Sequence, residues 1–142
     1  MTVSASNDSA QPILTPTGLL FTYGTLMFEP VWLRVVGRNR PSLPAVAAGW
    51  SVRCVAGRPY PAIVSDPDAI ATGRLYQGLS ERDFARLDRY EGAEYERRAI
   101  DVRLADNSIR QVFAYVARPA PYCRVSTELW DPTAFAAEHL VE

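Results

Sequence analysis

Three strand-like runs follow one another between residues 44 and 78, and only turn residues separate them. The runs are PAVAAGWSVRCVAG (44–57), RPYPAIVSD (58–66) and AIATGRLYQG (69–78), with Gly, Pro and an Asp-Pro-Asp sequence at their junctions. These residue types supply the backbone conformations that tight turns require. The pattern therefore predicts three neighbouring antiparallel strands in the middle of the chain.

Further strands lie on both sides of this block. A short apolar strand is predicted at 19–23, and a helix is predicted at 28–37, where Gly37 provides a stop. After residue 95, two strands are predicted around an Asp-Asn turn, because Ile, Val and Leu alternate there with Asp and Arg.

The clearest helix is SERDFARLDRYEG (80–92). Ser80 can cap its start together with Asp83, and Gly92 lies just past its end. The tail STELWDPTAFAAEHL (126–140) predicts a short amphipathic helix. The whole pattern, about six strands and three helices, indicates an α+β domain whose sheet curls to protect its edges.

The size and charge of the chain favour one domain with a small ligand. The 142 residues suit a single domain, expected at 18–142, and the polar residues 1–17 are expected to be a flexible arm without signal-peptide features. A net charge of -1 gives no strong positive potential that would attract nucleic acid. No apolar run is long enough to cross a bilayer. We therefore expect no nucleic-acid or membrane partner.

Few residues are available for metal binding or for a histidine-dependent nucleophile. The spacing of Cys54 and Cys123 matches no zinc or redox motif, so both are expected to be free thiols in a reducing compartment such as the cytoplasm. His139 is the only histidine and lies near the C-terminus. Any chemistry must therefore depend on carboxylates, hydroxyls, arginines or backbone groups.

Glu91 lies on the apolar face of the helix predicted at 80–92. With about 100° per residue, its side chain falls between those of Phe84 and Leu87. Arginines occupy the opposite face, where a carboxylate needed only for solubility would be placed. Burial and the negative end of the helix dipole both disfavour ionised Glu91, and they predict a raised pKa suited to a general base.

Other interpretations of these carboxylates remain open. Glu91 can instead lie in a frayed last turn, exposed to solvent or paired with Arg97 or Arg98. Asp88 is the competing acid, although it lies nearer the solvent edge of the apolar face. Glu94 and Glu96 flank Tyr95 and are expected to point away from whatever Tyr95 faces.

The stretch GLLFTYGTLM (18–27) combines a buried strand, a glycine and a predicted helix start. Glycine lets backbone approach a ligand closely, and N–H groups at a helix start can bind an anion. Neither a lysine nor a second glycine follows to support a nucleotide, so a small carboxylate fits better. The alternative is that Gly24 marks nothing more than a bend.

These motifs, in their order and spacing, resemble the γ-glutamylcyclotransferase-like superfamily, and within it the avirulence-induced-protein-like members. The resemblance covers roughly residues 18–142. It is carried by FTYGTLM, YPAIV, GRLYQGLSERDFARLDRYEGAEYERR, VFAYV and a tail containing Trp130, Phe135, His139 and Leu140.

The resemblance implies a small mixed six-stranded β-barrel flanked by helices, with a ligand at its mouth. It implies that Glu91 is the catalytic acid/base and that neither a cofactor nor a metal is needed. The positions that match the substrate-binding loop and pocket wall are Tyr23, Gly24, Thr25, Leu26, Tyr95 and Tyr115.

The implied reaction releases 5-oxoproline from a small γ-glutamyl substrate, by attack of the α-amine on its own γ-carbonyl. The protein is expected to be a monomer or a homodimer. One alternative is a non-catalytic ligand-binding member, or one that acts on γ-glutamyl-protected intermediates of a specialised pathway. Another is an interaction module that exposes Trp32, Trp50 and Trp130, although core packing suits these residues better.

Overall fold

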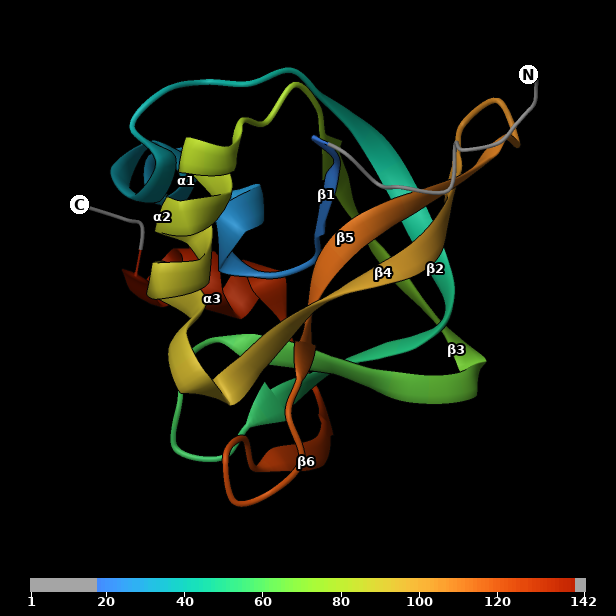
Figure 1. The fold of residues 1–142 in the computed structure, drawn as a ribbon. Helices are drawn as coiled ribbons and strands as arrows, with labels where there is room; N and C mark the ends of the chain where they lie inside the picture. The colour runs from blue at the N-terminus through green and yellow to red at the C-terminus, as the bar shows by residue number, and fades with distance from the viewer. Residues whose placement is uncertain (1–17, 140–142) are drawn as a thin grey trace.

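The computed structural model describes residues 18–139, so the arm expected at 1–17 lies outside the described residues. Six strands, three α-helices and two short 3₁₀ turns make up this part of the chain (Figure 1). In chain order they are β1 (Leu20–Thr22), η3 (Thr25–Met27), α1 (Glu29–Val36), β2 (Ser42–Val55), β3 (Pro61–Tyr76), α2 (Glu81–Glu91), η4 (Gly92–Glu94), β4 (Tyr95–Leu104), β5 (Ile109–Ala117), β6 (Val125–Leu129) and α3 (Pro132–His139).

Five of the strands close into a barrel. β1 pairs with β3 and β5, β5 with β4, β4 with β2, and β2 with β3. The pairings of β5 with β1 and with β3 are parallel and the others are antiparallel, which confirms the expected mixed barrel. The sixth strand, β6, pairs with β2 alone and lies beside the barrel. Closure removes most of the open sheet edges that would otherwise invite aggregation.

β2 and β3 form one long hairpin where the sequence predicted three strands. β3 continues through the Asp-Pro-Asp sequence, so the turn expected there is wrong. The pairing register shifts between Ala48 and Trp50, which leaves residues 66–69 bulged opposite Gly49. Pro67 has no N–H to donate, and in this bulge no ladder hydrogen bond is required of it.

The short helix predicted within the tail 126–140 is present, and it occupies only the second half of that segment. The first part of the segment forms β6, which pairs with the free end of β2, and α3 begins at Pro132. The Asp131 carboxylate accepts hydrogen bonds from the N–H groups of Thr133 and Ala134, and proline is well tolerated in a first helical turn. An available sheet edge therefore outweighs the weak helical pattern of residues 126–129.

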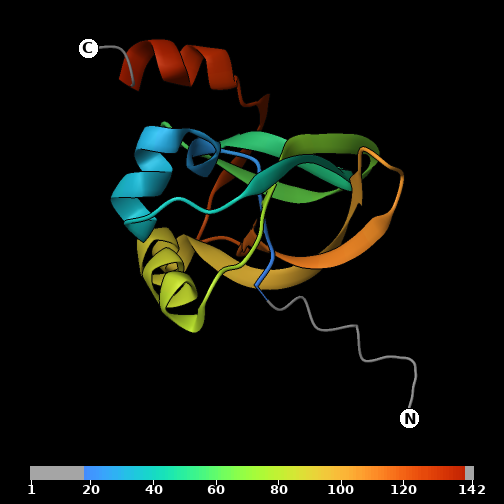
Figure 2. The ribbon, with the colours of Figure 1, turned by 90° about the horizontal axis from the view of Figure 1, so that it is seen from above.

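The two other helices begin or end where the sequence predicted. α1 ends at Gly37, whose φ of 88° is left-handed, and α2 starts with a reciprocal capping box between Ser80 and Asp83. Both helices lie against one side of the barrel (Figure 2). Trp32 of α1 stacks on Tyr76 of β3 with ring centroids 3.7 Å apart.

The apolar core has two parts. One part, between the helices and the barrel, includes fully buried Leu20, Trp32 and Leu87. The other takes residues from all five barrel strands, among them Phe21 and Ile63, and fills the barrel. Leu20 and Phe21 are neighbours on β1, and because successive side chains of a strand point to opposite faces, Leu20 belongs to the first part and Phe21 to the second.

Cys54 and Cys123 are free thiols, as predicted. Among residues 18–139, no helix is both long and apolar enough to span a membrane.

Closure of the barrel depends on a close approach between β1 and β3. Thr22 of β1 lies opposite Arg74 of β3, directly beside Gly73. A Cβ atom at Gly73 would lie 1.9 Å from the carbonyl oxygen of Thr22. No side chain fits in that space, so glycine at this position lets β1 close the barrel.

We expect Gly73→Ala to lower the free energy of unfolding by about 3 kcal/mol, because the added methyl group must push two paired strands apart. Chemical denaturation measures this change. Thr72→Ala is the control, because the Thr72 side chain is exposed on the same strand, and it should change the stability by less than about 0.5 kcal/mol. A Gly73→Ala protein as stable as the control would show that the β1–β3 contact is not tight.

Candidate functional site

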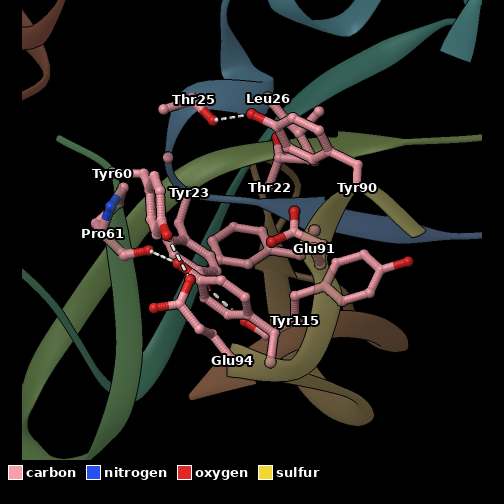
Figure 3. A pocket seen from close by; sticks show the side chains of 13 residues that line it. Thr22, Tyr23, Thr25, Leu26, Tyr60, Pro61, Tyr90, Glu91, Glu94 and Tyr115 are labelled. Carbon is pink, nitrogen blue, oxygen red and sulfur yellow. Dashed lines mark hydrogen bonds between the residues drawn. The ribbon is translucent and has the colours of Figure 1, made fainter. Parts of the chain in front are cut away.

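A cavity of about 140 Å³ opens at one end of the barrel, between the loop after β1, the start of β3 and the end of α2. Figure 3 shows side chains from all three segments converging on it. We call it the inner cavity, and its lining residues are Phe21, Thr22, Tyr23, Gly24, Thr25, Leu26, Tyr60, Pro61, Tyr90, Glu91, Glu94, Tyr95 and Tyr115.

Glu91, the last residue of α2, presents its carboxyl group to the inner cavity (Figure 3). Its side chain makes no hydrogen bond or ion pair with any residue in 18–139. Burial, followed by the negative charges of Glu94 and Asp88, raises the pKa of this carboxyl from 4.5 to about 8. Near neutral pH the group can therefore either accept or donate a proton.

The pairing of Glu91 with Arg97 or Arg98, which the sequence left open, does not occur. Arg97 binds Asp88 instead, with its Nε atom 3.0 Å from Oδ1 and its Nη2 atom 3.2 Å from Oδ2. The Tyr115 hydroxyl donates a third hydrogen bond to Asp88, over 2.6 Å. Asp88, the competing acid, is thus held as an ion pair, and Glu91 is the carboxylate without a partner.

The loop after β1 lines the cavity and carries backbone N–H groups that have no partner in the described residues. Residues Thr25–Met27 form a 3₁₀ turn between Gly24 and α1, so the helix start next to this glycine is one short turn. The N–H groups of Gly24, Thr25 and Leu26 donate to no acceptor within residues 18–139. Free N–H groups that converge on a cavity can bind a carboxylate or another oxyanion.

Gly24 allows this loop to lie directly against the start of β3. A Cβ atom at Gly24 would lie 2.7 Å from Cγ of Pro61, which lines the cavity. The loop could not hold its N–H groups in this position if residue 24 carried a side chain.

Three buried tyrosines form the wall of the cavity, each with its hydroxyl hydrogen bonded. Tyr23 donates to the carbonyl oxygen of Tyr115 over 2.5 Å, and Tyr95 donates to that of Pro61 over 2.6 Å. Burial is the main cause that raises the pKa of all three phenols, so they remain neutral. They shape the cavity and hold its segments together.

The sequence predicted the wrong direction for Glu94. The 3₁₀ turn Gly92–Glu94 delays the strand, so alternation starts only at Tyr95 and Glu94 faces the inner cavity beside it. The Tyr60 hydroxyl donates a short hydrogen bond to Glu94, and burial is the largest cause that raises the Tyr60 pKa to about 12. Glu96 is exposed, as predicted.

Sequence reasoning also missed Tyr60, Pro61 and Tyr90 as cavity residues. Tyr90 is 46% exposed, and its hydroxyl lies 3.3 Å from Oγ1 of Thr25, which links α2 to the β1 loop across the cavity. The helical periodicity of residues 80–92 could not reveal this role, because the loop that the Tyr90 ring meets lies 65 residues away in the sequence. Tyr60 and Pro61 begin the YPAIV motif, which by itself indicates a strand and no contact with a ligand.

The charges around the cavity suit a ligand that carries an ammonium group. Two lining residues, Glu91 and Glu94, are acidic, whereas the described lining residues include no Lys, Arg or His. Within residues 18–139, no group of three or more His, Cys, Asp or Glu side chains could hold a metal ion. An amino acid would place its carboxylate at the loop N–H groups and its ammonium near the acidic residues.

Comparison with known proteins agrees with this site. The family described as "Gamma-glutamyl cyclotransferase, AIG2-like" matches residues 20–132, which include every residue that lines the inner cavity. The chain belongs to this family.

The γ-glutamyl cyclotransferase, AIG2-like family includes relatives in Arabidopsis thaliana. Protein AIG2 C is 33% identical over 89 residues, which are 63% of this chain and 54% of that protein. AIG2-like protein C is 33% identical over 98 residues, or 68% of this chain and 57% of that protein. The matched region thus spans just over half the length of these relatives.

Solved structures share the fold. A protein of Arabidopsis thaliana, known from its solution structure, has a TM-score of 0.68 at 25% identity, with 87% of this chain and 83% of that chain covered. A structure described as a γ-glutamyl cyclotransferase has a TM-score of 0.68 at 12% identity, with 87% of this chain and 80% of that chain covered. The second likeness shows a common fold.

The raised pKa of Glu91 predicts a specific pH dependence of stability. The folded state binds the proton more tightly than the unfolded state, so the native protein loses stability as pH rises from about 4.5 to about 8. Glu91→Gln has no proton to lose. Its free energy of unfolding should exceed that of the native protein above pH 8 by on the order of 5 kcal/mol.

The difference should disappear below pH 4.5, where the carboxyl is protonated in both states. Chemical denaturation of both proteins across this range measures it. Glu96→Gln, which removes an exposed carboxylate, controls for the loss of one negative charge. A constant difference between Glu91→Gln and the native protein at all pH values would contradict the burial of an ionisable Glu91.

Proposed function

We propose that this protein is a γ-glutamyl cyclotransferase, which releases 5-oxoproline and an amine or amino acid from a small γ-glutamyl substrate. The observation that supports this proposal best is the arrangement of Glu91. Glu91 is half-buried, and its desolvated carboxyl has no partner in the described residues and a pKa of about 8; it shares one cavity with a set of free backbone N–H groups.

The substrate would bind by its α-carboxylate and α-ammonium. The carboxylate accepts hydrogen bonds from the N–H groups of the Gly24–Leu26 loop, and the ammonium lies between Glu91 and Glu94. Fixing one end of a flexible γ-glutamyl chain restricts it to conformations in which the amine can reach its own γ-carbonyl, so less conformational entropy remains to be lost in the internal attack.

Glu91 would carry the proton in this reaction. Its carboxylate takes a proton from the α-ammonium, and the free amine attacks the γ-carbonyl carbon to form the ring C–N bond. The Glu91 carboxyl then donates its proton to the leaving nitrogen as the original C–N bond breaks. The ring nitrogen still carries one proton too many, which the ionised Glu91 carboxylate takes and passes to the released amine or to water. One group can perform these steps because its pKa lies close to the working pH.

The tetrahedral intermediate carries a negative oxygen that requires hydrogen-bond donors. Loop N–H groups that the substrate carboxylate does not use are the nearest backbone candidates. The reaction is an acyl transfer within one molecule, so it needs no external nucleophile. We also propose a cytoplasmic location, which the two free thiols support.

The first test is Glu91→Gln, which keeps the size of the side chain and removes the proton. We expect 5-oxoproline release from γ-glutamyl substrates to fall at least about a hundredfold, the lower range for loss of a general acid/base. Chromatographic measurement of 5-oxoproline checks this, with circular dichroism as the folding control. Glu96→Gln should keep native activity, and undiminished turnover in Glu91→Gln would remove Glu91 from the mechanism.

The second test is the pH profile. Because Glu91 must be ionised to accept the first proton, kcat/KM should rise with pH along a limb near pH 8. The bound ammonium favours the ionised carboxylate, so the corresponding limb of kcat should lie at lower pH. A kcat/KM that is already constant above about pH 5.5, as for an ordinary glutamate, would contradict this role.

A further inference from the structure

A second hollow, of about 360 Å³, lies next to the inner cavity and is more open to solvent. We call it the outer hollow. Three of its residues, Glu91, Tyr95 and Tyr115, also line the inner cavity, so Glu91 stands at the boundary between the two. The residues that line the outer hollow alone are Asp88, Gly92, Arg97 and Phe113.

The proposed reaction requires such a second space. The γ-glutamyl group fills the inner cavity, and the leaving nitrogen must lie at Glu91 to receive its proton. Any group attached to that nitrogen therefore continues past Glu91. The outer hollow begins at that point, which makes it the site for the leaving group.

Arg97 is the only cationic residue among the described residues that line either space. Its guanidinium carbon lies 4.5 Å from the ring centroid of Phe84 and 4.6 Å from that of Phe113. These contacts and the two hydrogen bonds to Asp88 hold its orientation. The Arg97 side chain is 30% exposed to solvent, so a ligand can reach it.

In the ion pair of Arg97 and Asp88, the arginine still has an unused hydrogen-bond donor, whereas the carboxylate of Asp88 is already occupied. Asp88 already accepts three hydrogen bonds, two from Arg97 and one from Tyr115. Arg97 uses Nε and Nη2 for Asp88, whereas its Nη1 atom donates to no acceptor in residues 18–139. The outer hollow therefore offers a free cationic donor but no free carboxylate other than Glu91.

We propose that the outer hollow binds the leaving group, and that Arg97 Nη1 recognises a carboxylate on it. This inference rests on the proposed cyclotransferase function and narrows its substrates to γ-glutamyl amino acids over γ-glutamyl alkylamines or amides. Arg97 is a specificity-determining residue here. Once Glu91 has taken the proton of the substrate ammonium it is neutral, and it then does not repel a carboxylate bound at Arg97.

The test compares two substrates that differ in one group, γ-glutamylalanine and γ-glutamylalaninamide. In the native protein, kcat/KM for γ-glutamylalanine should be at least about tenfold higher, the effect of one charge-assisted hydrogen bond. In Arg97→Gln the two substrates should react with nearly equal kcat/KM. A merely structural role for Arg97 would lower both rates and leave their ratio unchanged.

Arg98→Gln is the matched control, because Arg98 is the next residue on β4, is exposed and lines neither space. It should keep the native ratio. If Arg97→Gln does not fold, Asp88→Asn provides the second variant. It weakens the hold on the guanidinium group and should raise the preference for γ-glutamylalanine.

Two results would overturn the inference in distinguishable ways. Equal kcat/KM for both substrates in the native protein would reject carboxylate recognition by Arg97, while 5-oxoproline release would still support the proposed function. No 5-oxoproline from either substrate, or from other γ-glutamyl amino acids and amines, would reject the function itself and the leaving-group site with it.

Discussion

The closure of the barrel by β1 is the contact on which the rest of the structure depends. Only three residues long, this strand pairs with β3 on one side and β5 on the other. It approaches β3 so closely that only glycine fits at position 73. Because β1 ends at the barrel mouth, the Gly24–Leu26 loop and the end of α2 come to line one cavity there, together with Glu91.

The opposite end of α2 stabilises the helix that carries this carboxyl. Asp83 is buried, completes the capping box with Ser80 and binds both Arg38 and Arg40 over 3.3 Å. Burial alone would raise the pKa of Asp83, but the hydrogen bonds from Ser80 and the two arginines lower it. Desolvating an unpaired glutamate costs free energy. The contacts at the start of α2 stabilise the helix and so offset this cost at its end.

Local signals predicted much of this fold. The caps of α2, the glycine that ends α1, the β4–β5 hairpin and the buried face of the 80–92 helix all follow from residue types and periodicity. The errors occur where a partner strand changes a local preference. Residues 66–69 bulge instead of turning, and residues 126–129 join a sheet edge instead of a helix, since pairing with β2 outweighs weak local propensity.

The sequence by itself determined the chemistry that the chain has available: an acid on an apolar helix face, a glycine after a buried strand, and a family pattern that links the two. Only the tertiary structure decided which charges pair. It joined Asp88 to Arg97 and left Glu91 without a partner, turned Glu94 toward the cavity, and placed a second hollow beyond Glu91. The pKa of a carboxyl depends on burial and on neighbours distant in sequence, and those exist only once the barrel has closed.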